Sequence, residues 1–79
     1  MKVNVEITDA VGHEPAYTWV KRHTLEVPQL MSHYSIIRRV KSAIGWDGKL
    51  CLTNDLGHMI QIRPHGESRI AFITFDKGE

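Results

Sequence analysis

The chain has 79 residues, of which 42% are hydrophobic and 24% are charged. This length allows one small domain, residues 1–79, and the ordinary composition argues against a disordered tail. The formal net charge of +1 argues against a strongly basic or acidic protein, and no apolar run in the sequence is long enough to cross a membrane.

Two strand-like segments come first. Val3, Val5 and Ile7 alternate with polar residues, which predicts a half-buried strand. Residues 12–15, Gly-His-Glu-Pro, predict a loop, because glycine and proline interrupt regular structure. Residues 17–27 are rich in β-formers, so we expect them to pair back on the first strand as a hairpin.

The alternation in this second segment is imperfect. Lys21 and His23 fall on the same face as Leu25, although a buried face should be apolar. Two explanations remain open: a β-bulge near Arg22, or an outer end of the strand that lies in solvent.

A single helix is predicted next, over residues 28–44. Pro28 suits the first turn, Lys41 complements the helix dipole near the end, and Gly45 is a natural terminator. The apolar stripe follows spacings of three and four residues; its members are Leu30, Tyr34, Ile37, Val40 and Ile44, and Ile36 and Ala43 widen it. Alternatively, Ser32 or Ser35 caps the helix, and residues 28–31 form a separate turn.

Three further strands complete the chain. Turn signals separate them, and the expected strands are residues 49–53, 58–63 and 68–75. The last strand is apolar on both faces, which indicates a central position or a covered second face. The order ββαβββ predicts an α+β fold, with one amphipathic helix on one face of a mostly antiparallel sheet of four to five strands. One helix covers only one face, so the other face must stay polar, bind a partner or pair in a dimer.

Motifs for chemistry are scarce. The spacings of the five histidines match no metal-binding motif, and we expect no metal or cofactor. Cys51 cannot form a disulfide within the chain, so the simplest compartment is the reducing cytoplasm. Cys51 and His58 lie on neighbouring expected strands and could form a nucleophile pair, but a buried, inert cysteine is the more common case.

Basic residues give the best candidate binding surface. Residues 20–49 hold six Lys or Arg and two Asp or Glu, whereas both flanking segments are net acidic. The candidate binding residues are Lys21, Arg22, Arg38, Arg39, Lys41 and Trp46. The alternatives are a solvated helix face for the basic residues and, for Trp46, a side chain that closes the core behind the helix.

Three functional classes follow from these features. We expect a non-catalytic protein that occupies a surface of a larger protein partner, as an adaptor or inhibitor. Short proteins without motifs are common among phage and mobile-element accessory proteins, including antagonists of host defence. The first alternative is nucleic-acid binding through the basic residues, and the second is a small cysteine or histidine enzyme. A homodimer is also expected as an option, through an edge strand or the second sheet face.

Overall fold

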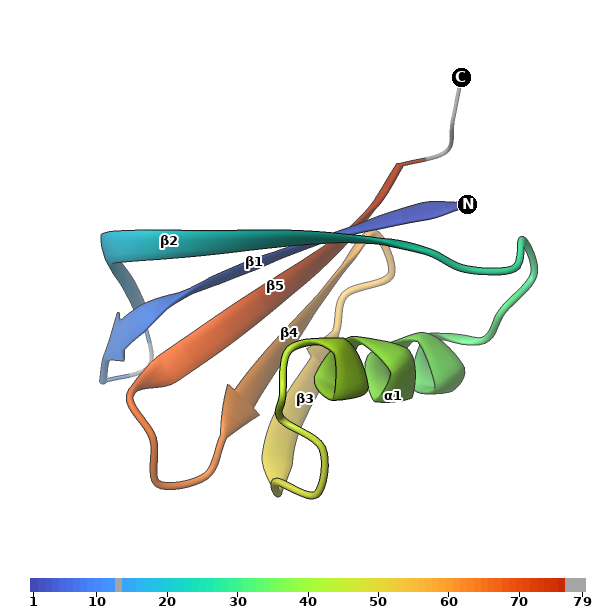
Figure 1. Ribbon diagram of the computed structural model, residues 1–79. Coiled ribbons are helices and arrows are strands. Elements are labelled where there is room, and N and C mark those ends of the chain that lie inside the picture. The colour runs from blue at the N-terminus through green and yellow to red at the C-terminus, as the bar shows by residue number, and fades with distance from the viewer. Residues whose placement is uncertain (13, 77–79) are drawn as a thin grey trace.

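The sheet and its single helix follow the expected ββαβββ order. A computed structural model describes residues 1–12 and 14–76 of the chain (Figure 1). The elements are β1 (Lys2–Val11), β2 (Glu14–Glu26), α1 (His33–Ala43), β3 (Cys51–Asp55), β4 (Met59–Pro64) and β5 (Arg69–Asp76). All five strands form one antiparallel sheet in the order β2-β1-β5-β4-β3, so the predicted α+β fold is confirmed.

β5 is the middle strand of this sheet, as its two-sided apolarity predicted. Ile73 pairs with Val5 of β1 on one side and with Ile60 of β4 on the other. The side chains of the two neighbouring strands flank a middle strand on each face, so its apolar side chains are partly shielded on both faces. β4 precedes β5 in the chain and also lies beside it in the sheet. The second neighbour of β5 in the sheet is β1, which comes from the other end of the chain.

The hydrophobic core lies between α1 and one face of the sheet. Alternate residues of β1, β4 and β5 point toward the helix, as the period of two requires. The core cluster consists of Val3, Val5, Ile7, Val27, Ile36, Val40, Trp46, Ile60, Ile62, Ala71 and Ile73. One face of the sheet is thus covered, and within the described residues α1 is the element that covers it.

The helix begins later than Pro28. Ser32 caps α1, and its hydroxyl accepts a hydrogen bond from the Ser35 N–H at 3.2 Å. Residues 28–31 form a separate turn in which the Met31 N–H donates to the Pro28 carbonyl at 3.3 Å. The first of the two expected helix starts is therefore wrong, and the capped alternative is confirmed. A serine hydroxyl satisfies an N–H that the turn would otherwise leave without a partner.

This shift changes which helix residues are buried. Leu30 lies outside the helix and is 100% exposed, and Tyr34 is 69% exposed. Val40 of the predicted stripe is fully buried, and so is Ile36 at its margin. Ile37 and Ile44 are half-buried and pack on the edge of the core. The predicted stripe is therefore correct at Val40, Ile37 and Ile44 and wrong at Leu30 and Tyr34, because the helix begins after Leu30 and its buried face is turned toward Ile36.

The end of the helix confirms the role expected for Gly45. Gly45 has a φ of 78°, in the left-handed region that glycine adopts without a Cβ clash. The Trp46 N–H donates to the Lys41 carbonyl at 2.7 Å, and the Gly45 N–H donates to the Ser42 carbonyl at 3.4 Å. These two bonds form a Schellman motif, which turns the chain so that Trp46 returns to the core.

The irregular alternation in β2 arises because this part of the strand lies in solvent, which is the second of the two proposed causes. Lys21 and His23 do share the helix-side face with Leu25, because their partners on β1 are the buried Ile7, Val5 and Val3. β2 is an edge strand, and Lys21 is exposed beside the helix. No register shift occurs at Arg22; the shift lies between Thr8 and Ala10 of β1, and Tyr17 opposite has a φ of 57°.

Candidate functional site

No described element covers the sheet face opposite α1. Its side chains are the alternate residues that point away from the core, and directly paired residues share this face. The members with at least partial exposure include Asn4, Glu6, Arg22, Thr24, Leu52, Asn54, Met59, Gln61, Arg63, Phe72 and Thr74. We call this surface the uncovered face. Near the C-terminal end of β1 this side of the sheet is no longer exposed. Thr8, Ala10 and Ile70 are buried there, and the Thr8 hydroxyl donates to the Trp19 carbonyl at 2.6 Å.

Phe72 lies at the centre of the uncovered face. It is half-buried on the middle strand, between Glu6 of β1 and Gln61 of β4. A shallow hollow of about 340 Å³ lies beside it, and Glu6 and Arg22 line its far side. An aromatic ring surrounded by polar groups is the arrangement found at the centre of many protein interfaces.

Charges on the uncovered face balance. Arg22 Nε donates to Glu6 Oε2 at 3.0 Å across the β1–β2 pair, so both charges are neutralised within the face. Arg63 and Asp76, which also point to this side, each have an interaction with a partner. A face whose charges cancel does not attract phosphate groups, whereas the surfaces that bind nucleic acid carry an excess of cations.

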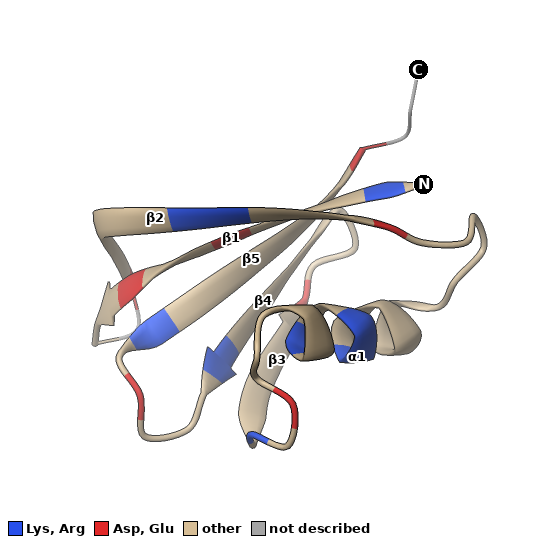
Figure 2. Cartoon of the chain, in the orientation of Figure 1, with Lys and Arg blue, Asp and Glu red and all other residues tan. Residues whose placement is uncertain are grey.

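The predicted basic surface is divided by the fold. Lys21 and Arg22 are adjacent in an extended strand, so they point to opposite faces of the sheet. Arg38 and Arg39 are exposed on α1, and the Arg38 guanidinium lies 6.0 Å from the centre of the Tyr34 ring. Figure 2 shows the basic stretches of β2 and α1 as separate patches. The structure therefore does not bring the predicted basic residues together as one surface.

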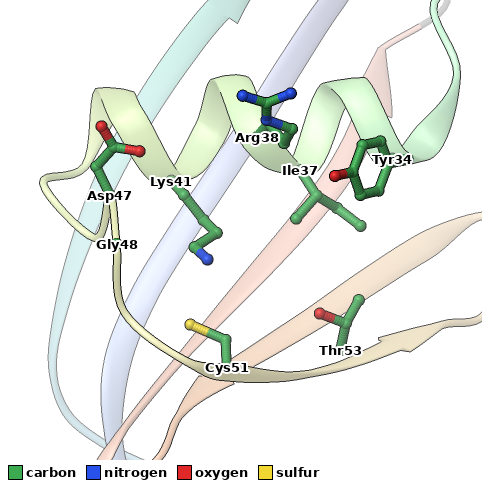
Figure 3. A pocket seen from close by; sticks show the side chains of 8 residues that line it. All are labelled: Tyr34, Ile37, Arg38, Lys41, Asp47, Gly48, Cys51 and Thr53. Atoms are coloured by element: carbon green, nitrogen blue, oxygen red, sulfur yellow. The ribbon is translucent and has the colours of Figure 1, made fainter.

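Lys41 lies in a hollow between α1 and β3. Figure 3 shows Lys41 reaching from the helix toward Cys51, while Arg38 points away from the strand. The Lys41 ammonium donates to the Lys49 carbonyl at 2.8 Å, so it fastens the helix to the segment before β3. This contact makes Lys41 a half-buried structural residue, unlike the solvated cation of the sequence hypothesis.

Cys51 and His58 do not meet. Cys51 pairs with Pro64 at one end of the β3–β4 hairpin, whereas His58 lies in the turn at the other end. The nucleophile pair suggested by the sequence is therefore wrong, because β3 runs over Cys51–Asp55 rather than over residues 49–53 and its register sets Cys51 opposite Pro64. Cys51 is half-buried, and its thiol faces the Lys49 carbonyl at 3.7 Å.

Trp46 is a core residue. It is 2% exposed and belongs to the main hydrophobic cluster, and the Arg69 guanidinium lies 5.6 Å from its ring centre. The ring is therefore not presented to a partner, and the packing alternative considered for Trp46 is the one observed. This corrects its place among the candidate binding residues.

Two contacts near β3 and β5 carried no local signal in the sequence. His33 Nδ1 lies 2.7 Å from Asp55 Oδ2, and the His33 ring stacks on Phe75 with centroids 5.0 Å apart. Glu67 accepts from Lys49 at 2.5 Å and also from Arg69. The His33–Asp55 and Lys49–Glu67 contacts join residues that only the fold brings together, whereas Glu67 and Arg69 are two residues apart in the chain.

These contacts predict an acid-sensitive stability. Hydrogen bonds from Lys49 and then Arg69 lower the pKa of the Glu67 carboxyl, and the Gly57 N–H followed by His33 lowers the pKa of Asp55. In the unfolded chain these carboxyls titrate at their ordinary values of about 4. The unfolded state therefore binds more protons in acid, so the stabilisation is present above pH of about 4 and is lost as the pH falls through the lowered values.

The measurement is the urea midpoint at pH 7 and at pH 3. We expect a lower midpoint at pH 3, and a smaller difference between the two pH values for Glu67→Gln than for the unchanged chain. Glu6→Gln is the matched control, because Glu6 lies on an exposed ion pair. An equal pH dependence in Glu67→Gln and the unchanged chain would contradict the assignment.

The described residues contain neither a metal-ligand cluster nor a helix that could cross a membrane. Among residues 1–12 and 14–76, no group of three or more His, Cys, Asp or Glu side chains is placed to hold a metal ion; His13 lies outside the described residues. No helix in the same part of the chain has the length and apolar character that crossing a membrane requires. Comparison with family models, with curated proteins and with solved structures finds no match to this chain.

Proposed function

We propose that this chain is a non-catalytic binding protein that occupies a surface of a larger protein through the uncovered face. The observation that carries the proposal is Phe72, a half-buried aromatic ring at the centre of a sheet face over which no described element packs. Binding hot spots are typically aromatic side chains near the middle of a contact, surrounded by polar groups that exclude water.

The charge distribution supports a protein partner in preference to nucleic acid. Glu6 and Arg22 neutralise each other on the uncovered face, and Lys21 points to the opposite side of the sheet. Electrostatic binding to a phosphate backbone needs several cations on one surface, and the affinity depends on how many phosphates they neutralise together. In this proposal the protein acts in the cytoplasm as an adaptor or inhibitor, and a phage or mobile-element protein that blocks a host system is one such role.

The area of the uncovered face limits how much surface it can bury against a partner. Five strands about 4.8 Å apart and about 20 Å long give roughly 500 Å², whereas a standard interface buries about 800 Å² on each partner. The partner must therefore reach beyond the flat face onto a strand edge or the hairpin loops. A face of this size is large enough for a central hot spot and too small to bind tightly without one.

Phe72→Arg tests the proposal directly. We expect this variant to lose the specific partner that the tagged unchanged chain captures from cells, with affinity for the purified partner reduced at least about tenfold. Ala43→Arg is the matched control, because it adds the same charge at an exposed position on the helix side. Circular dichroism of both variants checks that the fold is retained.

Two results would contradict the proposal. One is a partner that binds Phe72→Arg and the unchanged chain equally well. The other is capture of nucleic acid, or of no specific protein, by the unchanged chain.

A further inference from the structure

The two edges of the sheet differ in their protection against pairing. The β2 edge contains Pro15, the left-handed Tyr17, and the adjacent cations Lys21 and Arg22, all of which discourage another strand from pairing there. The β3 edge contains none of these features: Cys51–Asp55 carries no proline and no cation, and its one charged residue is Asp55 at the end of the strand. One edge of the sheet is therefore guarded and the other is open.

The open edge also exposes apolar side chains. Leu50 is 80% exposed, Leu52 is 52% exposed and Leu56 is 46% exposed. These three leucines point to the same side of β3, because they are separated by even numbers of residues. Three exposed leucines along a strand with an unguarded edge indicate a surface that becomes buried by a partner.

The backbone groups at this edge can be assigned. The Leu50 carbonyl accepts from the His65 N–H at 2.9 Å, and the Leu56 N–H donates to the Met59 carbonyl at 2.8 Å. Both residues therefore direct their backbone toward β4. Because the direction alternates along a strand, Cys51, Thr53 and Asp55 direct their N–H and C=O groups toward the free edge.

We propose that a second copy of this chain pairs antiparallel with β3 at this edge, about a twofold axis through Thr53. In this register Thr53 faces Thr53 of the second copy, and Cys51 faces Asp55 of the second copy. All the outward backbone groups of β3 are then used, since each of these pairs exchanges two hydrogen bonds. The contact is isologous and closes on itself, as expected for a symmetric dimer.

The leucines select this register. With Thr53 on the axis, Leu50 of one copy lies directly opposite Leu56 of the other, and the reverse contact forms on the other side of the axis. Leu52 lies diagonal to Leu52 and Leu56 of the other copy, within the reach of long side chains. The exposed leucines of both copies thus form one continuous apolar strip along the new strand pair.

Registers with the twofold axis at either of the other outward-facing residues of β3 are less favourable. A twofold axis at Asp55 would place the two Asp55 carboxylates opposite each other, and like charges in that position are destabilising. An axis at Cys51 would leave the outward groups of Asp55 without strand partners. The register centred on Thr53 therefore satisfies the leucines, the charges and the backbone together.

The dimer extends the sheet without blocking the uncovered face. The two copies form one continuous sheet with twice as many strands, and the two uncovered faces lie on the same side of it. The roughly 500 Å² of one face becomes about 1,000 Å², which exceeds the area a standard interface needs on one partner. The dimer itself does not rest on the proposed function, since its argument uses only the β3 edge.

Sedimentation of the purified full chain tests the dimer. We expect a concentration-dependent species of twice the 9.0 kDa chain mass. Thr53→Pro should abolish it, because proline removes the central outward N–H while a free edge strand tolerates the ring. Leu50→Lys alone and Leu56→Glu alone should each raise the dimer dissociation constant at least about tenfold.

Combining the two leucine substitutions gives a rescue test. In the double variant each introduced lysine at position 50 faces an introduced glutamate at position 56 of the other copy, so the dimer should return. Within one chain these positions are about 20 Å apart along the strand, so no internal ion pair can mimic the rescue. A monomer at all concentrations, or a dimer unaffected by Leu50→Lys, would overturn the proposal.

A cysteine placed on the axis tests the register. In a Cys51→Ser background, Thr53→Cys should form a disulfide-linked dimer under mild oxidation, since paired Cα atoms lie about 5.5 Å apart. Leu52→Cys in the same background should not, because its two copies would lie about 8 Å apart, beyond the reach of a disulfide. The opposite pattern would reject the Thr53 axis.

Discussion

Trp46→Ala should lower the free energy of unfolding by about 3–5 kcal/mol. Trp46 is 2% exposed, and alanine would leave a large cavity where the Schellman motif returns the chain to the core. Arg69 would also lose the ring that lies 5.6 Å from its guanidinium. For a chain of 79 residues the total stability is about 4–12 kcal/mol, so this one substitution removes a large share of it.

Trp19→Ala is the matched control, because it deletes the same side chain from a surface position. Trp19 is 43% exposed on the edge strand β2, so we expect a loss of at most about 1 kcal/mol. Urea unfolding followed by far-ultraviolet circular dichroism measures both variants without depending on tryptophan fluorescence. Similar losses in the two variants would show that Trp46 does not close the core.

The fold class could be predicted from the sequence because each element carries its own periodicity. Alternation at Val3, Val5 and Ile7 defined the first strand, and the two apolar faces of residues 68–75 predicted a central strand. The structure places that strand between β1 and β4. Local patterns thus contained enough information for the layer arrangement, since a strand with no polar face needs neighbours on both sides.

The phase of the helix could not be fixed in the same way. Leu30 continued the apolar spacing of Tyr34 and Ile37, although a capping serine lies between Leu30 and the helix. The apolar spacing alone does not show where the helix begins, because residues before and after the boundary can continue the same spacing. The hydroxyl of Ser32 decides where the helix starts, and this local bond outweighs a longer stripe.

How the candidate binding residues are grouped in space could not be predicted from the sequence, for two physical reasons. Lys21 and Arg22 were grouped by closeness in sequence, although the period of two sends adjacent strand residues to opposite faces. The ion pair between Glu6 and Arg22 and the contact between His33 and Asp55 join distant segments, so only the strand register reveals them. The uncovered face itself was predicted from dimensions alone, because one helix covers one side of a sheet.

Ile36→Ala should lower the free energy of unfolding by about 2–5 kcal/mol, because Ile36 is fully buried between α1 and the sheet. Leu30→Ala should change it by less than about 0.5 kcal/mol, since Leu30 is 100% exposed in the turn before the helix. The helix stripe expected from the sequence predicts the reverse ranking, because it contained Leu30 and placed Ile36 at its margin.

The comparison of these two variants therefore decides which face of α1 stabilises the sheet. Urea unfolding at pH 7 gives both values, and Val40→Ala should fall with Ile36→Ala because Val40 lies one turn later on the same buried face. A larger loss for Leu30→Ala than for Ile36→Ala would place α1 in a different rotation about its axis. The hollow between α1 and β3 would then have a different lining, since Lys41 reaches the Lys49 carbonyl only in the observed rotation.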